Sequence, residues 1–269
     1  MKNEILISIL IPTYNRVTYL KECLDSVLIQ KWFLENEIEI IVSDNSDNNI
    51  TENFINEYKL NNKNKIIIYN KNTPNIWPIN NFNKLLELKK WYYFIFLSDD
   101  DIFFDDKSLI SLYEWIKINN YDLAYGNNSL LSDKWIKEYK SCLTNSKKIF
   151  YEHNIWFWWT LYKDYWCKYD LNAWLYTDYD FNVNYVINKK ITYIDYNTVI
   201  YRLHEWQSIN SIPWIIDKKM KIYIFNKFKW YKYNLNAYFK IFLLYYLIKF
   251  LNIIWIYYVI LKIIKKYEK

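Results

Sequence analysis

The chain contains, at residues 94–101, the stretch Phe94-Ile95-Phe96-Leu97-Ser98-Asp99-Asp100-Asp101, an apolar run that ends in three consecutive carboxylates. Such a run indicates a buried strand of an α/β sheet. Ligands of open α/β sheets bind beyond the carboxyl ends of the strands, which is where these acids are expected. The triplet predicts either a site for a hard divalent cation, Mg²⁺ or Mn²⁺, or an acidic surface turn, and alone it does not separate the two.

Strand-like and helix-like segments alternate over the first two hundred residues, which is typical of a mostly parallel sheet. The predicted strands cover residues 5–11, 38–42, 65–69, 92–97, 121–125 and 191–201. Helices are expected over residues 20–28, 80–90, 109–118 and 177–188, and from Asn49 onward. Residues 132–176 have no clear pattern.

The chain has 269 residues, enough for one large domain or for one domain with an appendage. Its formal net charge is +6, and much of the excess lies in the last fifty residues. No nucleic-acid-reading motif accompanies that charge, so the sequence predicts no nucleic acid partner. The three cysteines show no metal-ligand spacing, which is typical of a reducing cytoplasm.

Residues 213–269 form a basic, aromatic-rich tail with a helical pattern. Residues 241–261 would be long enough to cross a bilayer, but Lys249 and Asn252 interrupt them. We expect an interfacial amphipathic helix whose lysines face anionic lipid, which would make the protein peripheral on a membrane surface. A helix packed on the protein's own core and a single transmembrane span are the alternatives.

Glycine is almost missing: the chain has 1, whereas average usage of roughly 7% would give many more. Tryptophan is abundant, at 14. Several tryptophans stand at positions where turns typically have glycine. These are Trp77 in a loop, Trp91 after a predicted helix, Trp206, and the doublet at 158–159. One hypothesis is that these are UGA codons read as glycine; the alternative is a genuinely tryptophan-rich protein from an AT-rich genome.

Four motifs together resemble family 2 glycosyltransferases of the GT-A fold. They are Ile7-Ser8-Ile9-Leu10-Ile11-Pro12-Thr13-Tyr14-Asn15-Arg16, Ile40-Ile41-Val42-Ser43-Asp44-Asn45-Ser46, Asn75-Ile76-Trp77-Pro78-Ile79-Asn80-Asn81 and Leu97-Ser98-Asp99-Asp100-Asp101. The resemblance covers roughly residues 5–210. It implies a Rossmann-like, mostly parallel sheet flanked by helices over residues 1–212, followed by the C-terminal helical extension over 213–269.

The resemblance also implies a nucleotide-sugar site and a metal site. The expected nucleotide-sugar residues are Pro12, Thr13, Tyr14, Arg16, Asp44 and Asp99. The expected ligands of Mn²⁺ or Mg²⁺ are Asp100, Asp101 and His204, the last from a segment, Arg202-Leu203-His204, that resembles the family's R-x-H. Asp99 with Asp101 makes a literal DxD, so which acids contact the metal is left open. Asp44 capping a turn is the structural alternative.

A further segment, Thr177-Asp178-Tyr179-Asp180-Phe181, resembles the family's ED-x-D, with Thr177 in place of the usual Glu. It implies that Asp178 is the catalytic base. The alternative is an acid favoured in the first turn of a helix by the helix dipole.

Taken together, the resemblance implies a metal-dependent, inverting glycosyltransferase of the hexosyltransferase type. Its donor would be a nucleotide-diphosphate sugar, expected to be UDP-linked, and its acceptor a hydroxyl of a cell-envelope glycan or glycolipid. The resemblance and the tail place it in the cytoplasm, peripheral on the inner face of the cell membrane. A polyprenyl-phosphate glycosyltransferase and a non-catalytic GT-A-like binding module are the alternatives.

Overall fold

The computed structural model describes residues 7–31, 33, 37–90, 92–132, 135–139, 159–163, 167–186, 189–203 and 227. The chain divides into two units, Met1–Met220 and Lys221–Lys269, and every element below belongs to the first. The predicted tail over residues 213–269, apart from Lys227, lies outside the described residues, as do Trp91, His204 and Trp206.

Four parallel strands form the first half of the sheet, in the spatial order β3-β2-β1-β4. They are β1 (Ile7–Thr13), β2 (Ile38–Asp44), β3 (Ile66–Lys71) and β4 (Tyr93–Phe96). β1 is paired on both sides, so that Leu10 lies opposite Ile41 of β2 and Phe96 of β4. Because these strands are parallel, their carboxyl ends meet at one edge of the sheet, which is where a ligand of this architecture binds.

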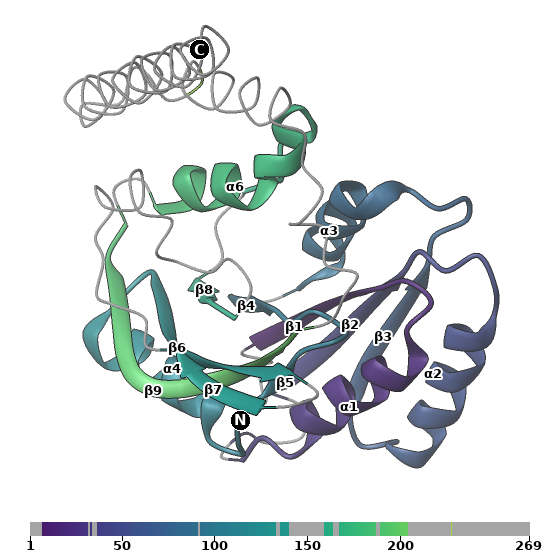
Figure 1. Ribbon diagram of the computed structural model, residues 1–269, viewed down its shortest axis with the longest axis horizontal. Helices are drawn as coiled ribbons and strands as arrows, with labels where there is room; N and C mark the ends of the chain where they lie inside the picture. The colour runs from purple at the N-terminus through teal and green to yellow at the C-terminus, as the bar shows by residue number, and fades with distance from the viewer. Residues whose placement is uncertain are drawn as a thin grey trace, which may run out of the picture. The chain divides into compact units, whose positions relative to one another are not determined.

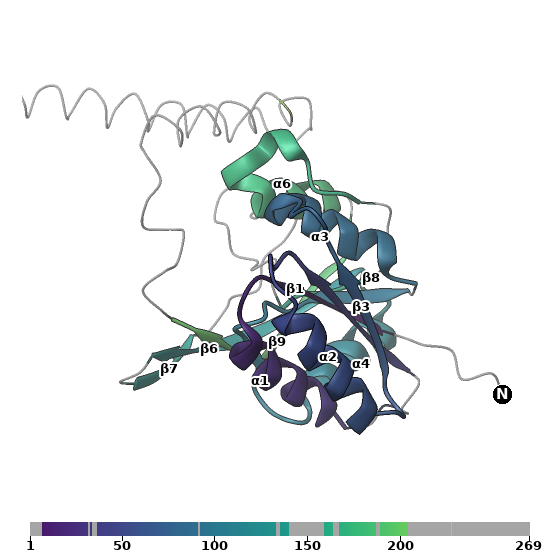
Figure 2. The ribbon, with the colours of Figure 1, turned by 90° about the vertical axis from the view of Figure 1, so that its right-hand side faces the viewer.

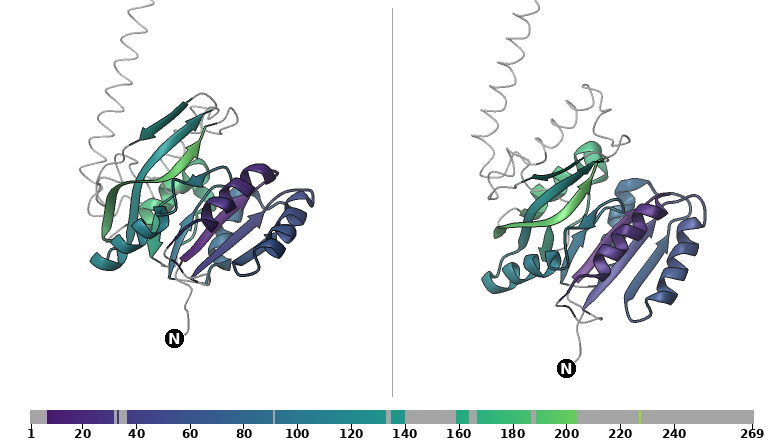
Figure 3. Two further views of the ribbon diagram at one scale, coloured as in Figure 1. Left: turned by 90° about the horizontal axis from the view of Figure 1, so that it is seen from below. Right: turned by 60° about the horizontal axis from the view of Figure 1, so that its bottom comes forward.

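The second half of the sheet is mixed. Its strands are β5 (Ile102–Phe103), β6 (Leu123–Ser132), β7 (Trp135–Tyr139), β8 (Leu161–Lys163) and β9 (Ile191–Arg202). β8 runs antiparallel to both β4 and β6 and so joins the two halves, whereas β6 and β9 are parallel. Figure 3 shows β6, β7 and β9 side by side. The end of β9 thereby returns toward the acids that follow β4.

Helices cover both faces of the sheet (Figure 1). They are α1 (Val17–Leu28), α2 (Ile50–Asn61), α3 (Trp77–Leu88), α4 (Ser108–Asn119) and α6 (Thr177–Val186), and a 3-10 turn, η1 (Leu171–Tyr176), precedes α6. In Figure 2, α1, α2 and α4 lie on one side of the sheet and α3 and α6 on the other. On α1, the helically spaced Leu20, Leu24 and Val27 are buried in the core, as their periodicity predicts.

An aromatic cluster fixes α6 on the sheet. Phe94 of β4 stacks on Tyr162 of β8, with ring centroids 5.1 Å apart. Tyr169 in turn stacks on Phe181 of α6 at 4.7 Å and contacts Phe82 of α3 at 5.2 Å. Aromatic pairs at such separations add to the stabilisation from their burial. The cluster therefore holds the start of α6 at a defined place beside β4.

The predicted α/β class with a mostly parallel sheet flanked by helices is confirmed, while several boundaries differ. The first strand, predicted over residues 5–11, runs further than expected, because β1 continues to Thr13 with Pro12 opposite Ser43. α3 begins at Trp77 rather than at residue 80, with a proline at its start, where a missing N–H costs no helical hydrogen bond.

β6 extends to Ser132, well beyond the predicted 121–125, because β7 and β9 pair with it. Within the described ranges, no helix has both the length and the apolar character that a membrane crossing requires. The stretch 241–261 lies outside those ranges.

Candidate active site

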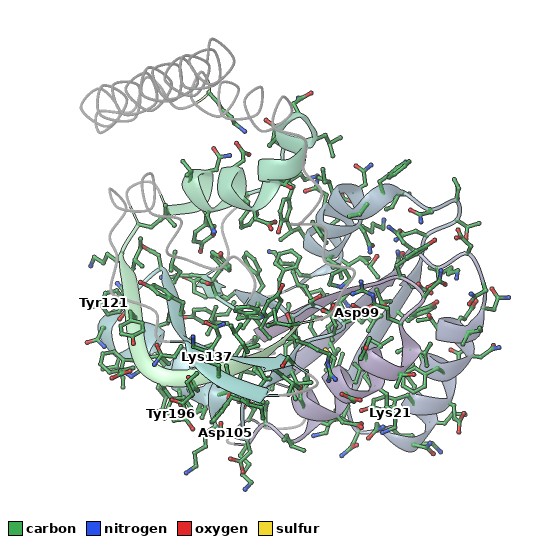
Figure 4. All side chains as sticks on the ribbon, in the orientation of Figure 1. Lys21, Asp99, Asp105, Tyr121, Lys137 and Tyr196 are labelled. Carbon is green, nitrogen blue, oxygen red and sulfur yellow. The ribbon has the colours of Figure 1, made fainter. Side chains whose placement is uncertain are left out.

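Three chain segments converge at the carboxyl edge of the parallel strands. Thr13 ends β1 and lies opposite Asp44, the last residue of β2. Beyond β4, the Leu97 N–H donates to the Leu10 carbonyl at 3.0 Å, which keeps the chain beside β1 until the acids begin. Asp99, labelled in Figure 4, lies among these segments, whereas the labelled Asp105 and Tyr196 lie away from them. The edge thus gathers residues from sequence positions far apart.

The first two acids are tied to the loop after β1. The Thr13 hydroxyl donates to Asp99 Oδ2 at 2.7 Å. The Arg16 guanidinium lies 2.6 Å from Asp100 Oδ2 and 3.4 Å from Asp99 Oδ1. The Ser98 hydroxyl donates to the other oxygen of Asp100 at 2.5 Å. One arginine therefore supplies the positive charge that two adjacent carboxylates share.

The third acid has different partners. Asp101 Oδ1 accepts a hydrogen bond from the Arg202 N–H at 3.2 Å, and Oδ2 accepts one from the Trp159 indole at 2.9 Å. The Arg202 Nε donates to the carbonyl of Asp100 at 3.2 Å, and its guanidinium pairs with Glu22. Asp101 thus joins the acid loop to the end of β9 and to residue 159.

Burial and mutual repulsion make the triplet electrostatically strained. Asp99, Asp100 and Asp101 are all buried. Burial, followed by the charge of Asp100, raises the pKa of Asp99 to about 7, although Thr13 and Arg16 favour its charged form. Burial and the charge of Asp100 also raise the pKa of Asp101 well above its usual range. Full ionisation of the three acids near neutral pH therefore requires positive charge beyond what Arg16 supplies.

Asp44 is fully buried and has protein partners at both oxygens. The backbone N–H of Ser46 donates to Oδ1 at 2.7 Å, which is the turn-capping contact expected as the structural alternative. The Tyr69 hydroxyl donates to Oδ2 at 2.7 Å, and Lys71 Nζ lies 3.3 Å from the same oxygen. Nearby, the exposed Tyr14 hydroxyl donates to Asp47 at 3.0 Å. Asp44 therefore lies at the centre of a polar group formed by the ends of β2 and β3.

Asp178 lies in the first turn of α6 and is half-buried. Burial is the main cause of the raised pKa values of Tyr169 and Tyr162, and the negative charge of Asp178 adds to both. The backbone N–H of Tyr169 donates to Asn83 of α3 at 2.8 Å, and Asn83 donates back to the Tyr169 carbonyl at 3.1 Å. Asp178 is thus held on the α3 side of the sheet, on an element separate from the acid triplet.

The predicted metal ligands form a partial set. Within the described part of the chain, no group of three His, Cys, Asp or Glu side chains is spaced to hold a metal ion. The oxygen ligands suit Mg²⁺ or Mn²⁺, and the contacts of Asp100 include the Arg16 guanidinium and the Ser98 hydroxyl. The donor set fits a cation at Asp100, with Asp99 beside it. His204 lies outside the described residues.

Sequence reasoning missed four residues of this edge: Tyr69, Lys71, Ser98 and Trp159. The first two could have been found, because they are two residues apart on a strand predicted to adjoin the one ending in Asp44, so their side chains share a face. Trp159 could not, since it contacts Asp101 across 58 positions and belongs to the segment without a clear pattern.

Known proteins resemble this chain in sequence and in fold. Residues 8–168 match the model of the family described as glycosyl transferase family 2. An abequosyltransferase of Salmonella typhimurium is 41% identical over 109 residues, which cover 40% of this chain and 32% of the relative. A poly(ribitol-phosphate) beta-glucosyltransferase of Bacillus spizizenii is 29% identical over 120 residues, which cover 45% of this chain and 18% of the relative. The chain thus matches about a third or less of the length of each.

Two solved structures share the fold. TarS 1–349 of S. aureus, in complex with UDP-GlcNAc, aligns with a TM-score of 0.66 and 16% identity over 82% of this chain and 67% of that 1–349 chain. The mannosyltransferase PcManGT of Pyrobaculum calidifontis, in complex with GDP-Man and Mn²⁺, aligns with a TM-score of 0.58 and 10% identity over 84% of this chain and 64% of that one. At these identities the alignments establish the fold alone.

Proposed function

This chain belongs to glycosyl transferase family 2, and on that premise we propose that it is a metal-dependent, inverting glycosyltransferase. It would move a sugar from a nucleotide-diphosphate donor, UDP-linked in our proposal, to a hydroxyl of a cell-envelope glycan or glycolipid. The observation that supports this most is the link between Arg16 and both Asp99 and Asp100, which brings the loop after β1 to the acids after β4.

On the donor side, the strand ends offer groups of suitable chemistry. Asp44, buried at the end of β2, would accept a hydrogen bond from an N–H edge of the nucleobase through a remaining lone pair, while Tyr69 and Lys71 fix its orientation. Pro12 and Thr13 form the end of β1 beside it, Tyr14 follows the strand, and Arg16 would offset phosphate charge. Asp99, held by the Thr13 hydroxyl, would accept a hydrogen bond from the ribose.

Asp100, with Asp101 and His204 as further proposed ligands, would hold Mn²⁺ or Mg²⁺. When bound, such a cation neutralises the negative charge that develops on the departing nucleoside diphosphate. Mn²⁺ is part of the Pyrobaculum mannosyltransferase complex with GDP-Man. The raised pKa values of Asp99 and Asp101 support this role, because a buried acidic triplet needs added positive charge to stay ionised.

On the acceptor side, Asp178 would take the proton of the acceptor hydroxyl while its oxygen attacks the anomeric carbon. The new glycosidic bond forms as the bond from that carbon to the diphosphate oxygen breaks, and the configuration inverts. The dense aromatic packing around Phe181 supports a positioned base, since α6 cannot shift without disturbing the core of the sheet.

The acceptor class rests on the relatives. One relative's name gives poly(ribitol-phosphate) as the molecule it glucosylates, and the basic tail over residues 213–269 would bring this chain to an anionic surface. We therefore propose an acceptor at the inner face of the cell membrane.

A turnover assay with a panel of UDP-, GDP- and TDP-sugars, with and without Mn²⁺, tests the function. We expect Mn²⁺-dependent turnover that Asp100→Asn abolishes and that Asp178→Asn lowers by about 10²–10⁴-fold with nucleotide binding retained. Glu114→Gln, an exposed carboxylate on α4, is the matched control. A polyprenyl phosphate is included among the acceptors, because transfer to it would identify the alternative enzyme, a polyprenyl-phosphate glycosyltransferase. Wild-type protein that binds nucleotide but turns over no donor would contradict an enzyme and favour a binding module.

A further inference from the structure

Two tryptophans adopt a backbone conformation that tryptophan rarely takes. Among the described residues, the non-glycine residues with positive φ are Asn15 (55°), Trp77 (67°), Asn120 (50°) and Trp159 (74°). Asparagine tolerates this left-handed region because its short polar side chain can bond locally. A bulky side chain there is strained, whereas glycine is not. Residues 77 and 159 are therefore positions where the fold asks for glycine.

The single glycine of the chain stands at a different kind of position. At Gly126 of β6, a Cβ would lie 2.5 Å from Thr198 Cγ2 and 2.6 Å from the Tyr196 carbonyl oxygen. Glycine is thus present where β6 and β9 leave no room for any side chain, yet absent from the described left-handed positions. Because both the crowded position and the left-handed positions favour glycine, we expect glycine at residues 77 and 159 as well as at 126.

We propose that residues 77 and 159 are glycine in the protein that the cell makes, encoded by UGA codons, and that glycine at 159 completes the cation site at Asp101. The residue assignment stands on backbone geometry and composition alone. Its consequence for Asp101 rests on the proposed function.

At residue 159 the tryptophan side chain binds one of the acids of the site, Asp101. The indole is 4% exposed, and its Nε1–H donates to Asp101 Oδ2 at 2.9 Å. The other oxygen, Oδ1, accepts from the Arg202 N–H at 3.2 Å. With glycine at 159, Asp101 keeps the backbone contact that orients it and loses the indole on Oδ2. One carboxylate oxygen of Asp101 then has no indole donor and is released to turn toward a cation held at Asp100, as an oxygen ligand of the kind that Mn²⁺ and Mg²⁺ prefer.

At residue 77 the tryptophan side chain does not pack in the core. Trp77 is 77% exposed at the start of α3, and its backbone N–H donates to Asn75 Oδ1 at 2.9 Å. Glycine would keep that backbone bond and remove the strain. Residue 77 therefore provides a test of backbone preference that is free of packing effects.

Peptide mass spectrometry of the protein from its source cells tests the assignment directly. We expect the peptides that cover residues 77 and 159 to have the residue mass of glycine at both. A tryptophan mass, or a UGG codon in the gene, at either position overturns the assignment there. This readout does not depend on any enzymatic activity.

Thermal unfolding gives a second test. We expect Trp77→Gly to raise the melting temperature by about 2–4 °C through relief of the left-handed strain. Trp115→Gly is the control, because Trp115 lies within α4 and is 47% exposed, so glycine should lower the melting temperature there. If both substitutions lower it alike, residue 77 does not prefer glycine and the assignment is overturned.

Calorimetric titration with Mn²⁺ tests the consequence for Asp101. We expect Trp159→Gly to bind Mn²⁺ at least about ten-fold tighter than the tryptophan chain, a free-energy difference of about 1.4 kcal/mol. The gain should vanish when Asp101→Asn is added. Trp159→Phe, which fills the space but lacks the indole N–H, should also bind Mn²⁺ tighter, and it replaces the glycine variant should that variant not fold. If the tryptophan protein and all variants bind Mn²⁺ with equal affinity while mass spectrometry finds glycine at 159, the proposed cation site is overturned and the residue assignment stands.

Discussion

The Arg16 guanidinium lies 2.6 Å from Asp100 Oδ2, so a side chain just after β1 neutralises an acid just after β4. The same guanidinium reaches Asp99 at 3.4 Å. The arginine side chain is 37% exposed, while the acids are buried. A partly exposed cation over a buried acidic pair is suited to exchange acid contacts for phosphate contacts when a nucleotide diphosphate binds.

Replacing this arginine should weaken donor binding. We expect Arg16→Gln to raise the donor KM about ten-fold, because one charge-assisted contact to phosphate is lost, and to lower the free energy of unfolding by about 1 kcal/mol. Steady-state kinetics and urea unfolding measure the two effects. Lys21→Gln, which removes the exposed ion pair with Asp25 on α1, is the control and should change neither. A donor KM that is the same for both variants would contradict the phosphate role.

The pKa of Asp99 predicts how stability depends on pH in buffer with a chelator. The pKa is about 7 in the fold against an ordinary 3.8, so between these values the folded chain binds a proton that the unfolded chain lacks. The resulting stabilisation is complete below about pH 4 and is lost as pH rises through 7, at up to about 1.4 kcal/mol per pH unit.

Urea unfolding from pH 5 to 8 checks that dependence. Asp99→Asn should flatten the fall in stability, leaving only the part that Asp101 contributes in the same direction. Glu57→Gln, an exposed residue of α2, should leave the profile unchanged. A wild-type profile that rises between pH 5 and 7 would show that the buried acids are not held protonated.

Two matched tyrosines separate donor binding from stability. Tyr69 donates to Asp44 and Tyr58 donates to Asp25, both at 2.7 Å, but only Asp44 lies at the strand ends. Tyr69→Phe should raise the donor KM by about ten-fold with little change in kcat, since the nucleobase contact is equally present in the ground and transition states. Tyr58→Phe should leave both constants unchanged. Equal kinetic effects of the two would refute the nucleobase role of Asp44.

The sequence was a good guide wherever local pattern decides structure. β1, β2 and β4 were predicted because each is an apolar run, and the convergence of Thr13, Asp44 and Asp99 follows from parallel strands ending at one edge. The partners of Asp101 were not predictable. Trp159 and Arg202 lie 58 and 101 positions away and reach it only through the pairing of β8 with β4 and of β9 with β5 and β6.

Glycine scarcity explains much of the rest. Turn positions are normally read from glycine, and the segment over residues 132–176 has none in the printed sequence. The expected left-handed position at Trp77 was confirmed by its φ of 67°. Trp91 and Trp206 lie outside the described residues and stay predictions.

The aromatic cluster predicts a coupling between stability and catalysis. Phe181 is fully buried, stacks on Tyr169 and lies three residues after Asp178 on α6. Phe181→Ala should lower the free energy of unfolding by about 3–5 kcal/mol, measured by denaturant titration, because it leaves a cavity. Phe181→Leu should cost less and should lower kcat more than it raises the donor KM. A leucine variant with wild-type kcat would mean that the position of α6 does not matter for catalysis.

Nucleotide binding at the strand-end acids is the central claim, and calorimetric titration of UDP tests it most directly. The chain should have the residues at 77 and 159 that mass spectrometry assigns, and should be titrated with Mn²⁺ and with EDTA. The account predicts binding that requires Mn²⁺ and that Asp100→Asn weakens by at least about ten-fold, while Glu114→Gln leaves it unchanged. UDP binding of equal affinity in EDTA and in Asp100→Asn, or no binding of UDP at all, would contradict it.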